Sequence, residues 1–289
     1  MTFENLIETA WNDHADRPQE VADRLASSLA LIDSAQRIVP FARLVTHVFG
    51  EHLGQWRRGI EVLESLRGTP ACDGSPASTS ALARGIAVLR HTSGEHDALA
   101  PLSTEDRIAV LASAASAFAG RHEFRRAVAA YAEASRLAES GLPSGSPAIR
   151  ALAIGGNNLA AALEEKGDRD AFETRGMIAA AEGGLKYWKQ SGTWLEEERA
   201  EYRLARSLLQ AGEPRAAVDS ARRCIAVCAA NDALAFEQFF GYAVLALAQR
   251  AAGDGNGFAA SRREALDRFE QVASDEKAWC ASALEELSG

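Results

Sequence analysis

Alanine is the feature that most constrains this chain, because it makes up roughly one in five of the 289 residues. Valine, isoleucine and the aromatic residues are sparse by comparison. Alanine loses no side-chain entropy in a helix, whereas sheets depend on β-branched and aromatic residues. The composition therefore predicts an all-α fold. A helical chain of this length can form one or two globular domains, or a row of small repeats with no single core.

The distribution of charge limits the partners of the chain. The formal net charge is −9, and the acidic residues are spread evenly, with no stripe of lysine and arginine. Proteins that bind nucleic acids neutralise phosphates with clustered basic residues. We therefore expect no nucleic acid partner.

The sequence shows no sign of secretion or of a membrane. The N-terminus lacks the basic and apolar regions of a signal peptide, and the longest stretch of low polarity, 108–119, is too short to cross a bilayer. The four cysteines lack the paired spacing of a disulfide framework or a zinc ribbon, which fits a reducing compartment. We expect a cytoplasmic protein with no membrane partner.

The spacing of apolar residues and of helix breakers divides the chain into three parts. In the first part, 1–67, helices are predicted over 2–14, 18–37, 41–52 and 56–66. Pro40 separates the second helix from the third, and Gly54 forms the turn of a hairpin between the third and the fourth.

The second part, 68–103, is predicted to be a linker with a single helix over 81–91. Its first residues, 68–80, are rich in glycine, proline, serine and threonine, and 93–102 is irregular as well. The third part, 104–289, has a regular pattern of small and large residues at helical spacing.

This third part resembles the tetratricopeptide repeat (TPR) family, in which each repeat is a pair of antiparallel helices. One matching unit contains Leu111, Ala114, Ala115, Phe118, Phe124, Ala127, Tyr131, Ala134 and Leu137, and another contains Leu204, Ala205, Leu208, Gly212, Ala217, Ala221, Cys224 and Val227. The turn glycines at 167, 212 and 253 are 45 and 41 residues apart, longer than the standard repeat of about 34. The resemblance is therefore to the extended-repeat type.

The resemblance implies a right-handed superhelical solenoid of helix-turn-helix repeats. Small residues such as Ala115, Ala127 and Ala205 would let paired helices approach, and stacking would bury a continuous core. The last helical run, 275–287, has Trp279, Leu284 and Leu287 on one side. It is expected to be a capping helix over the final apolar face.

By the same resemblance, the function is non-enzymatic: the chain is an adaptor or scaffold that binds a protein or peptide in the concave groove lined by the first helix of each repeat. Asn157 and Asn158 would hold a peptide backbone, and the arginines would select an acidic partner. The candidate binding residues are Asn157, Asn158, Arg199, Tyr202, Arg206, Gln210, Phe240 and Arg250. The plain alternative is that these are solvated helix residues, with the arginines paired to Glu197, Glu198 and Glu201.

Other functions stay open beside this one. Some bacterial proteins with such repeats are intracellular receptors for a signal peptide or a small ligand. Self-assembly into a homo-oligomer through the groove or the terminal helices is also compatible with the sequence. No Gly-rich phosphate loop, nucleophile elbow or calcium loop is present, so neither an enzymatic activity nor a cofactor is predicted.

Three residues, His47, Glu51 and His52, are the candidates for a metal-dependent module, because imidazole and carboxylate groups bind zinc. Their spacing argues against such a site. In an α-helix, residues five apart lie about 140° around the axis, unlike the histidines of zinc enzymes, which are four apart. No metal is therefore predicted, and His14 is interpreted as a surface or turn residue.

Cys224 and Cys228 share a helix face, which allows a redox or metal role, but a small buried hydrophobic residue fits the repeat pattern better. The acidic residues 196–198 follow Thr193 at the start of a predicted helix, where negative charge favours the helix dipole. Trp188 and Trp194 are interpreted as packing residues.

Overall fold

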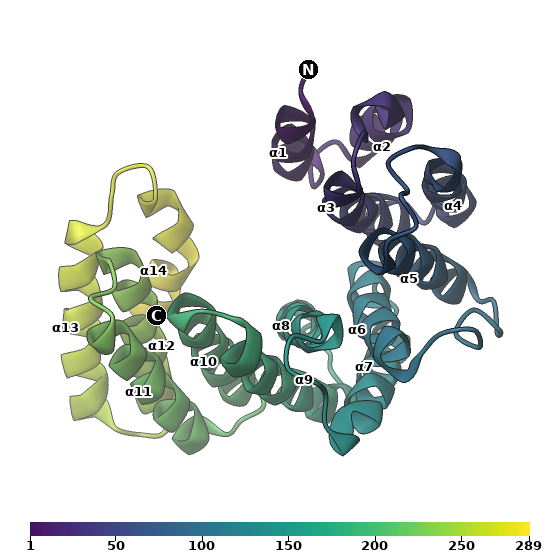
Figure 1. The fold of residues 1–289 in the computed structure, drawn as a ribbon. Coiled ribbons are helices and arrows are strands. Elements are labelled where there is room, and N and C mark those ends of the chain that lie inside the picture. Colours follow the sequence, from purple (N-terminus) through teal and green to yellow (C-terminus); the bar gives the residue numbers. More distant parts are fainter. The chain divides into compact units, whose positions relative to one another are not determined.

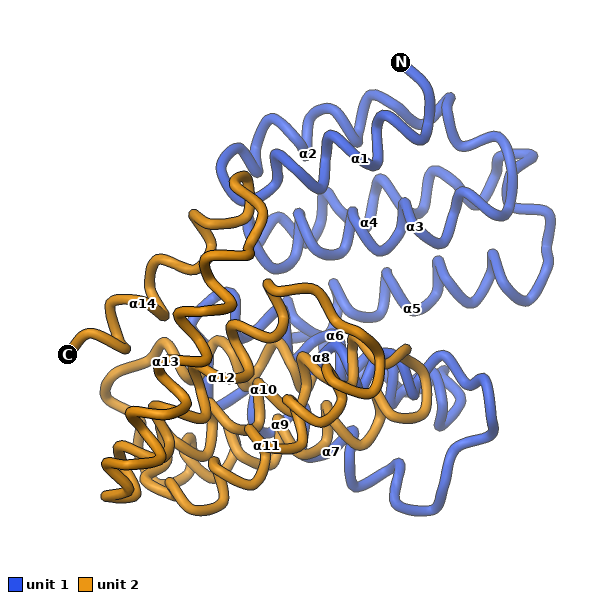
Figure 2. The backbone as a smooth tube through the Cα atoms, turned by 90° about the vertical axis from the view of Figure 1, so that its left-hand side faces the viewer, with its two compact units in different colours: residues 1–155 blue, residues 156–289 orange.

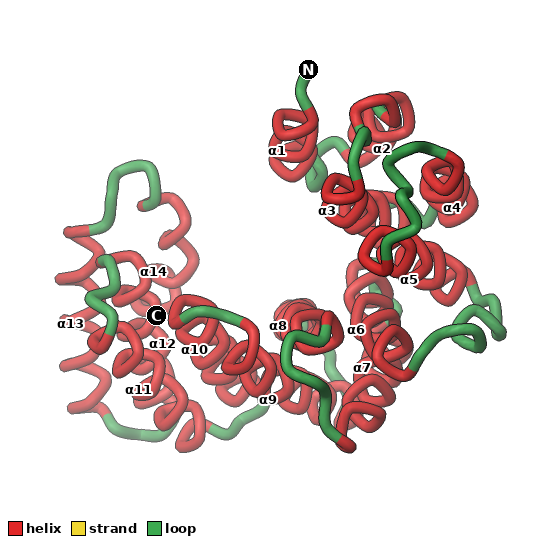
Figure 3. Tube along the Cα trace, viewed as in Figure 1, coloured by secondary structure: helices red, strands yellow, loops and turns green.

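The chain folds into helices alone. The computed structural model describes residues 1–289 and contains fourteen α-helices. Figure 3 shows helices and loops but no strand. The predicted all-α fold is confirmed. No helix combines the length and the apolar character needed to cross a membrane.

The helices belong to two compact units, 1–155 and 156–289 (Figure 2), and the boundary between the units falls inside α8. The α-helices of unit 1 are α1 (Phe3–Asp13), α2 (Pro18–Ser27), α3 (Ala35–Val45), α4 (Trp56–Ser65), α5 (Pro76–Ser93), α6 (Thr104–Gly120) and α7 (Phe124–Leu137). Then follow α8 (Pro147–Glu165), α9 (Ala171–Ser191), α10 (Trp194–Gln210), α11 (Pro214–Ala230), α12 (Ala235–Ala251), α13 (Gly255–Gln271) and α14 (Ala281–Ser288) (Figure 1). The division into 1–67, 68–103 and 104–289 stays a prediction.

Unit 1 differs from the sequence prediction in its second and third helices. The helix that starts at Pro18 ends at Ser27, and α3 begins at Ala35 and continues through Pro40. The break expected at Pro40, which has no N–H to donate, is therefore wrong. The fully buried side chains of Ile38, Phe41 and Leu44 give α3 an apolar face in the core, and this packing maintains the helix.

The residues after α3 form a π-helical segment, Thr46–His52, in place of the predicted α-helix. The amide of Leu53 donates to the carbonyl of Val48, five residues earlier, which is the hydrogen-bond spacing of a π-helix. Gly54 then reverses the chain with a φ of +62°, which confirms the predicted turn before α4. Unit 1 therefore contains a short π-helix, a rare type of helix, between α3 and α4.

Unit 2 contains two complete hairpins in which each helix pair is joined by a short turn: α10 with α11, and α12 with α13. In unit 1, α6 and α7 form a hairpin of the same kind. Ala115, Ala127, Ala205 and Ala217 are all fully buried in these pairs, as the repeat pattern predicted. The small side chains let the helices approach closely, and larger residues fill the space toward the next hairpin.

The hairpin around Gly54 uses glycine where the later hairpins use alanine. A Cβ on Gly59 would lie only 2.9 Å from both the Cβ of Phe49 and the Cδ1 of Leu89. The sequence interpretation missed this small contact residue, because in the later units the pattern was carried by alanine. Close approach of α4 to the π-helical segment therefore depends on the absence of a side chain.

Candidate functional site

The arginines predicted to bind a partner are found at a contact with the last helix of the chain. Arg206 of α10 donates to the carboxylate of Glu286 in α14 at 2.7 Å. Arg250 of α12 donates to the backbone carbonyl of the same glutamate at 3.1 Å. Two first helices of successive hairpins thus hold one acidic residue of α14.

Burial and charge act on Arg206 in opposite directions. Its burial works to lower the pKa of the guanidinium, whereas the hydrogen bond to Glu286 and the neighbouring Tyr202 raise it, and the net pKa is raised. The guanidinium therefore keeps its charge at this half-buried position. A charged donor that is partly withdrawn from water binds a carboxylate more strongly than an exposed one.

Two aromatic candidates lie beside this ion pair and contact each other. The rings of Tyr202 and Phe240 meet edge to face with centroids 5.7 Å apart, and burial raises the pKa of the Tyr202 hydroxyl. Phe240 also contacts Phe236 and Phe239 of its own helix. The arrangement places two partly buried aromatic rings next to the arginines.

The remaining candidates do not share one contact. Arg199 pairs with Glu237 at 3.2 Å, and Gln210 accepts a hydrogen bond from Arg169. Asn157 is half-buried and Asn158 is exposed on α8. The structure therefore brings together Tyr202, Arg206, Phe240 and Arg250, but not the other four.

The position of α14 differs from that of a simple terminal cap. Its buried residues, Ala283 and Leu287, lie in a cluster with Phe239 and Leu247 of α12. Arg262 of α13 donates to the carbonyl of Leu287 at 2.9 Å. Since α14 contacts Arg206 of α10 as well, it reaches beyond the final hairpin and lies on helices predicted to bind a partner.

A buried polar cluster lies between α10 and α11. Glu198 is only 2% exposed and accepts a hydrogen bond from the thiol of Cys224 at 3.0 Å. Burial raises the pKa of Glu198 to about 7, and the hydrogen bond with Cys228 together with burial raises the pKa of the Cys224 thiol. A thiol that stays protonated is a poor nucleophile and metal ligand, which supports the interpretation of these cysteines as buried packing residues.

The three glutamates that start α10 therefore have different roles. Glu196 forms a capping box with Thr193, which confirms the interpretation of this region as a helix start. Glu198 is instead buried against the next helix. Its position one helical turn from Glu201, which is also buried, is the signal that the sequence analysis missed.

Glu198 gives the stability of unit 2 a defined dependence on pH. The folded state keeps a proton that the unfolded chain loses near the ordinary pKa of 4.5, so the free energy of unfolding should fall between pH 4.5 and about 7. The total decrease is about 3 kcal/mol. Glu198→Gln should remove this decrease and make the protein more stable than wild type at pH 8, as measured by urea unfolding at a series of pH values.

The neighbouring carboxylate provides a matched control. Glu197 is partly exposed near Lys189, so Glu197→Gln should leave the pH dependence in place. Equal pH profiles for Glu198→Gln and wild type would contradict the role assigned to this buried carboxyl.

An open pocket of about 320 Å³ lies near the same helices. Its polar lining is already paired: Glu201, only 1% exposed, contacts Lys189 at 3.1 Å and Arg223 at 3.0 Å. Trp194 contributes part of the wall, while Trp188 is buried. The ion pairs connect α9, α10 and α11, and they leave few unpaired polar groups in the pocket wall that could bind a ligand.

His14, His47 and His52 lie closer together in unit 1 than the sequence analysis predicted. The Nε2 atoms of His47 and His52 are 3.1 Å apart, because the segment that contains them is π-helical and residues five apart share a face. The ring of His14, from the end of α1, lies 4.8 Å from His47 and 5.1 Å from His52 between centroids. The expected separation of His47 and His52 around an α-helix is therefore wrong. His14 lies in the turn after α1, as expected of a surface or turn residue, but its ring also contacts the other two.

Two further groups shape this histidine cluster. Glu51 accepts from Nδ1 of His47 at 2.9 Å, so the predicted acidic candidate contacts an imidazole. Burial, and then the neighbouring His47, lower the pKa of His52, while Glu51 works in the opposite direction. The candidate metal residues of the sequence therefore lie in one cluster, with His14 as an additional member.

Comparisons with known proteins found similar chains among solved structures. No family model matches the sequence, and no curated protein matches it. A putative kinesin light chain from Podosopora anserina, with nearly identical TPR-like repeats, is 16% identical and has a TM-score of 0.46. The match covers 75% of this chain and 96% of that one. A single-residue variant of the same protein gives the same values.

The fold defines the class of protein. The antiparallel hairpins with alanine at their helix contacts have the helix-turn-helix arrangement of a helical repeat fold.

Proposed function

We propose that this chain is a non-enzymatic protein-binding scaffold whose α10 and α12 helices bind an acidic, amphipathic segment of a partner. The observation that carries the proposal is the convergence of Arg206 and Arg250 on Glu286 of α14. An acidic helix with apolar Leu287 on one side already lies on this surface. The surface therefore has the charge and the apolar area that such a segment needs.

In this proposal α14 occupies the site in the free chain, and a partner segment of similar chemistry displaces it. Asn157 and Asn158 of α8 would contact the backbone of a longer partner segment, and Arg199 would add charge selection. A helix of eight residues is marginal by itself, so its docking depends on the contacts of Glu286, Ala283 and Leu287. Displacement by a partner is then energetically accessible.

The proposal predicts binding in trans once α14 is removed. A chain that ends at residue 280 should bind a labelled peptide of residues 275–289, measured by fluorescence anisotropy. Arg206→Ala/Arg250→Ala in that chain should weaken binding about tenfold or more, because two hydrogen bonds from charged donors are lost. The affinity should also fall with added salt.

Matched variants separate this site from general attraction between charges. Arg222→Ala/Arg263→Ala removes the same charge from exposed arginines of the second helices α11 and α13, and should leave the affinity unchanged. If the shortened chain folds by circular dichroism but does not bind the peptide, the proposed function is wrong. A second test uses the full chain and needs no truncation. Glu286→Arg should release α14 and open the site to the peptide, whereas Glu285→Arg, at an exposed position, should not.

A further inference from the structure

We infer that His14, His47 and His52 form a binding site for a divalent transition metal ion such as Zn²⁺. One ring nitrogen of each histidine lies within 4.8 Å of the others. Imidazole is a preferred ligand of Zn²⁺, Cu²⁺ and Ni²⁺, and three histidines with one open position form a known type of zinc coordination. The site lies in unit 1 and is independent of the surface proposed for partner binding in unit 2.

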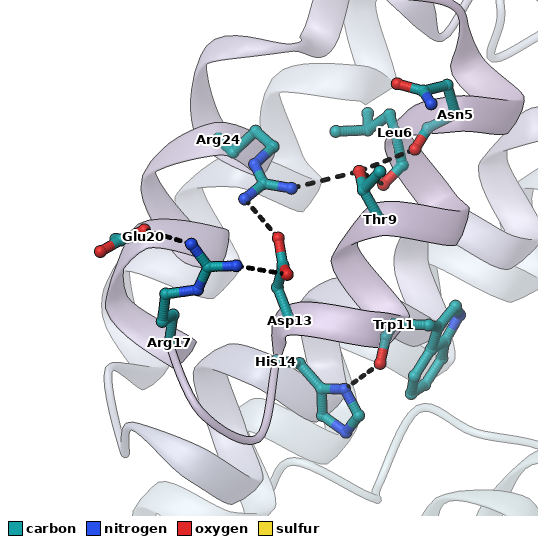
Figure 4. Close-up of polar contacts among 9 residues, drawn as sticks. All are labelled: Asn5, Leu6, Thr9, Trp11, Asp13, His14, Arg17, Glu20 and Arg24. Carbon is teal, nitrogen blue, oxygen red and sulfur yellow. Dashed lines mark hydrogen bonds and ion pairs between the residues drawn. The ribbon is translucent and has the colours of Figure 1, made fainter. Parts of the chain in front are cut away.

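Hydrogen bonds to the opposite ring nitrogens orient two of the three ligands. Nδ1 of His14 bonds to the carbonyl of Trp11 at 2.6 Å (Figure 4), and Nδ1 of His47 bonds to the carboxylate of Glu51 at 2.9 Å. Both oxygens accept hydrogen bonds, so the neutral tautomer that fits this arrangement has its proton on Nδ1 and leaves Nε2 for a metal ion. Carbonyl and carboxylate partners of this kind surround the histidine ligands of metal sites in proteins.

The separation of the ligand atoms fits one small ion. Nε2 of His47 and Nε2 of His52 are 3.1 Å apart. Two nitrogens bound to the same tetrahedral Zn²⁺ lie about 3.3 Å apart. The exposed His52 side chain can adjust to bring the three nitrogens, all within 4.8 Å of one another, around one ion, and solvent would fill the fourth position.

The fold holds the ligand-bearing segments in place from both sides. At the end of α1, the carboxylate of Asp13 pairs with Arg17 at 2.6 Å and with Arg24 at 2.8 Å (Figure 4). These two ion pairs hold Asp13, and with it the adjacent His14, against α2. On the other side, Gly120 of α6 has no Cβ, which would collide with the Cγ of Glu51. The Glu51 side chain therefore lies directly against α6 while its carboxylate contacts His47.

The π-helical segment supplies an independent reason to expect a site here. A π-helix is rare, costs regular hydrogen bonding and occurs frequently at functional positions. Here it places His47 and His52, five residues apart, on one face. The same two side chains on a regular α-helix would point in different directions, so the metal site depends on this backbone.

The test is a Zn²⁺ titration of the full chain without a purification tag, after treatment with a chelator, by isothermal calorimetry. We expect one Zn²⁺ per chain with a micromolar or tighter Kd. His14→Ala, His47→Ala and His52→Gln should each weaken binding about a hundredfold, and Glu51→Gln about tenfold. A Co²⁺ titration should give the visible spectrum of a four-coordinate ion with nitrogen ligands in wild type and lose it in His14→Ala.

Control variants decide between this site and other binding. His96→Ala, at an exposed position, should bind Zn²⁺ as wild type does, and so should Cys224→Ser/Cys228→Ser, which removes the buried thiols of unit 2. Absence of micromolar binding by the folded wild type overturns the inference. So does a loss of binding in the cysteine variant, or a wild-type affinity in His14→Ala and His52→Gln.

Discussion

Replacing Phe239 by alanine should lower the free energy of unfolding of unit 2 by about 3–5 kcal/mol. The side chain is fully buried in α12, contacts the rings of Phe240 and Phe269, and lies in the cluster that receives α14. Its removal costs the transfer free energy of a phenyl ring and leaves a cavity that the neighbouring hairpin can close only in part. Urea unfolding and hydrogen exchange of α12–α14 measure the effect.

Trp279 is the matched aromatic control, since its side chain is 75% exposed next to the same helix α14. Trp279→Ala should change the stability by no more than about 0.5 kcal/mol. A similar loss of unfolding free energy in both variants would show that the apolar cluster under α14 does not stabilise unit 2 as its burial predicts. Because Phe239 supports Phe240, its replacement should also weaken peptide binding by the shortened chain.

Replacing Gly155 by alanine should destabilise unit 1 by about 1–3 kcal/mol. The Cβ would lie 2.6 Å from the backbone carbonyl oxygen of Ala112 in α6, and a backbone atom cannot rotate away. The sign is opposite to that of helix propensity, which favours alanine over glycine by about 1 kcal/mol in a helix interior. The steric cost of this contact outweighs the gain in helix propensity, so the net effect is destabilising.

Gly255 is the control for the propensity term. It lies at the start of α13, and nothing is within 4 Å of the position that its Cβ would take. Gly255→Ala should leave the stability unchanged or raise it slightly. Chemical unfolding of both variants provides the comparison, and a stabilised Gly155→Ala protein would mean that α6 and α8 do not approach as closely as the structure places them.

The sequence predicted the hairpins well, because their information is local. Ala115 and Ala127 occupy the positions where the repeat pattern requires small residues, and Gly212 and Gly253 mark the turns after α10 and α12, so both the helix pairs and their contacts follow from the pattern. The capping box at Thr193 was local in the same way. The helix through Pro40 was not predicted, because burial of Phe41 and its neighbours outweighs the missing hydrogen bond.

The candidate sites depended on contacts that the sequence does not display. The arginines of α10 and α12 were identified from the repeat pattern, but nothing local shows that Glu286 would lie between them. The histidine cluster was missed for two reasons. The spacing of His47 and His52 was interpreted with α-helical geometry, and His14 joins them only through tertiary packing.

The hairpins of unit 2 have a consequence for how such a chain can evolve. Each hairpin contacts mainly the helices next to it in the sequence, and the turns after α10 and α12 have the same length and the same glycine with positive φ. Duplication of one hairpin inserts a unit that already matches both neighbours. The length of the array can therefore change by gene duplication without redesign of the core.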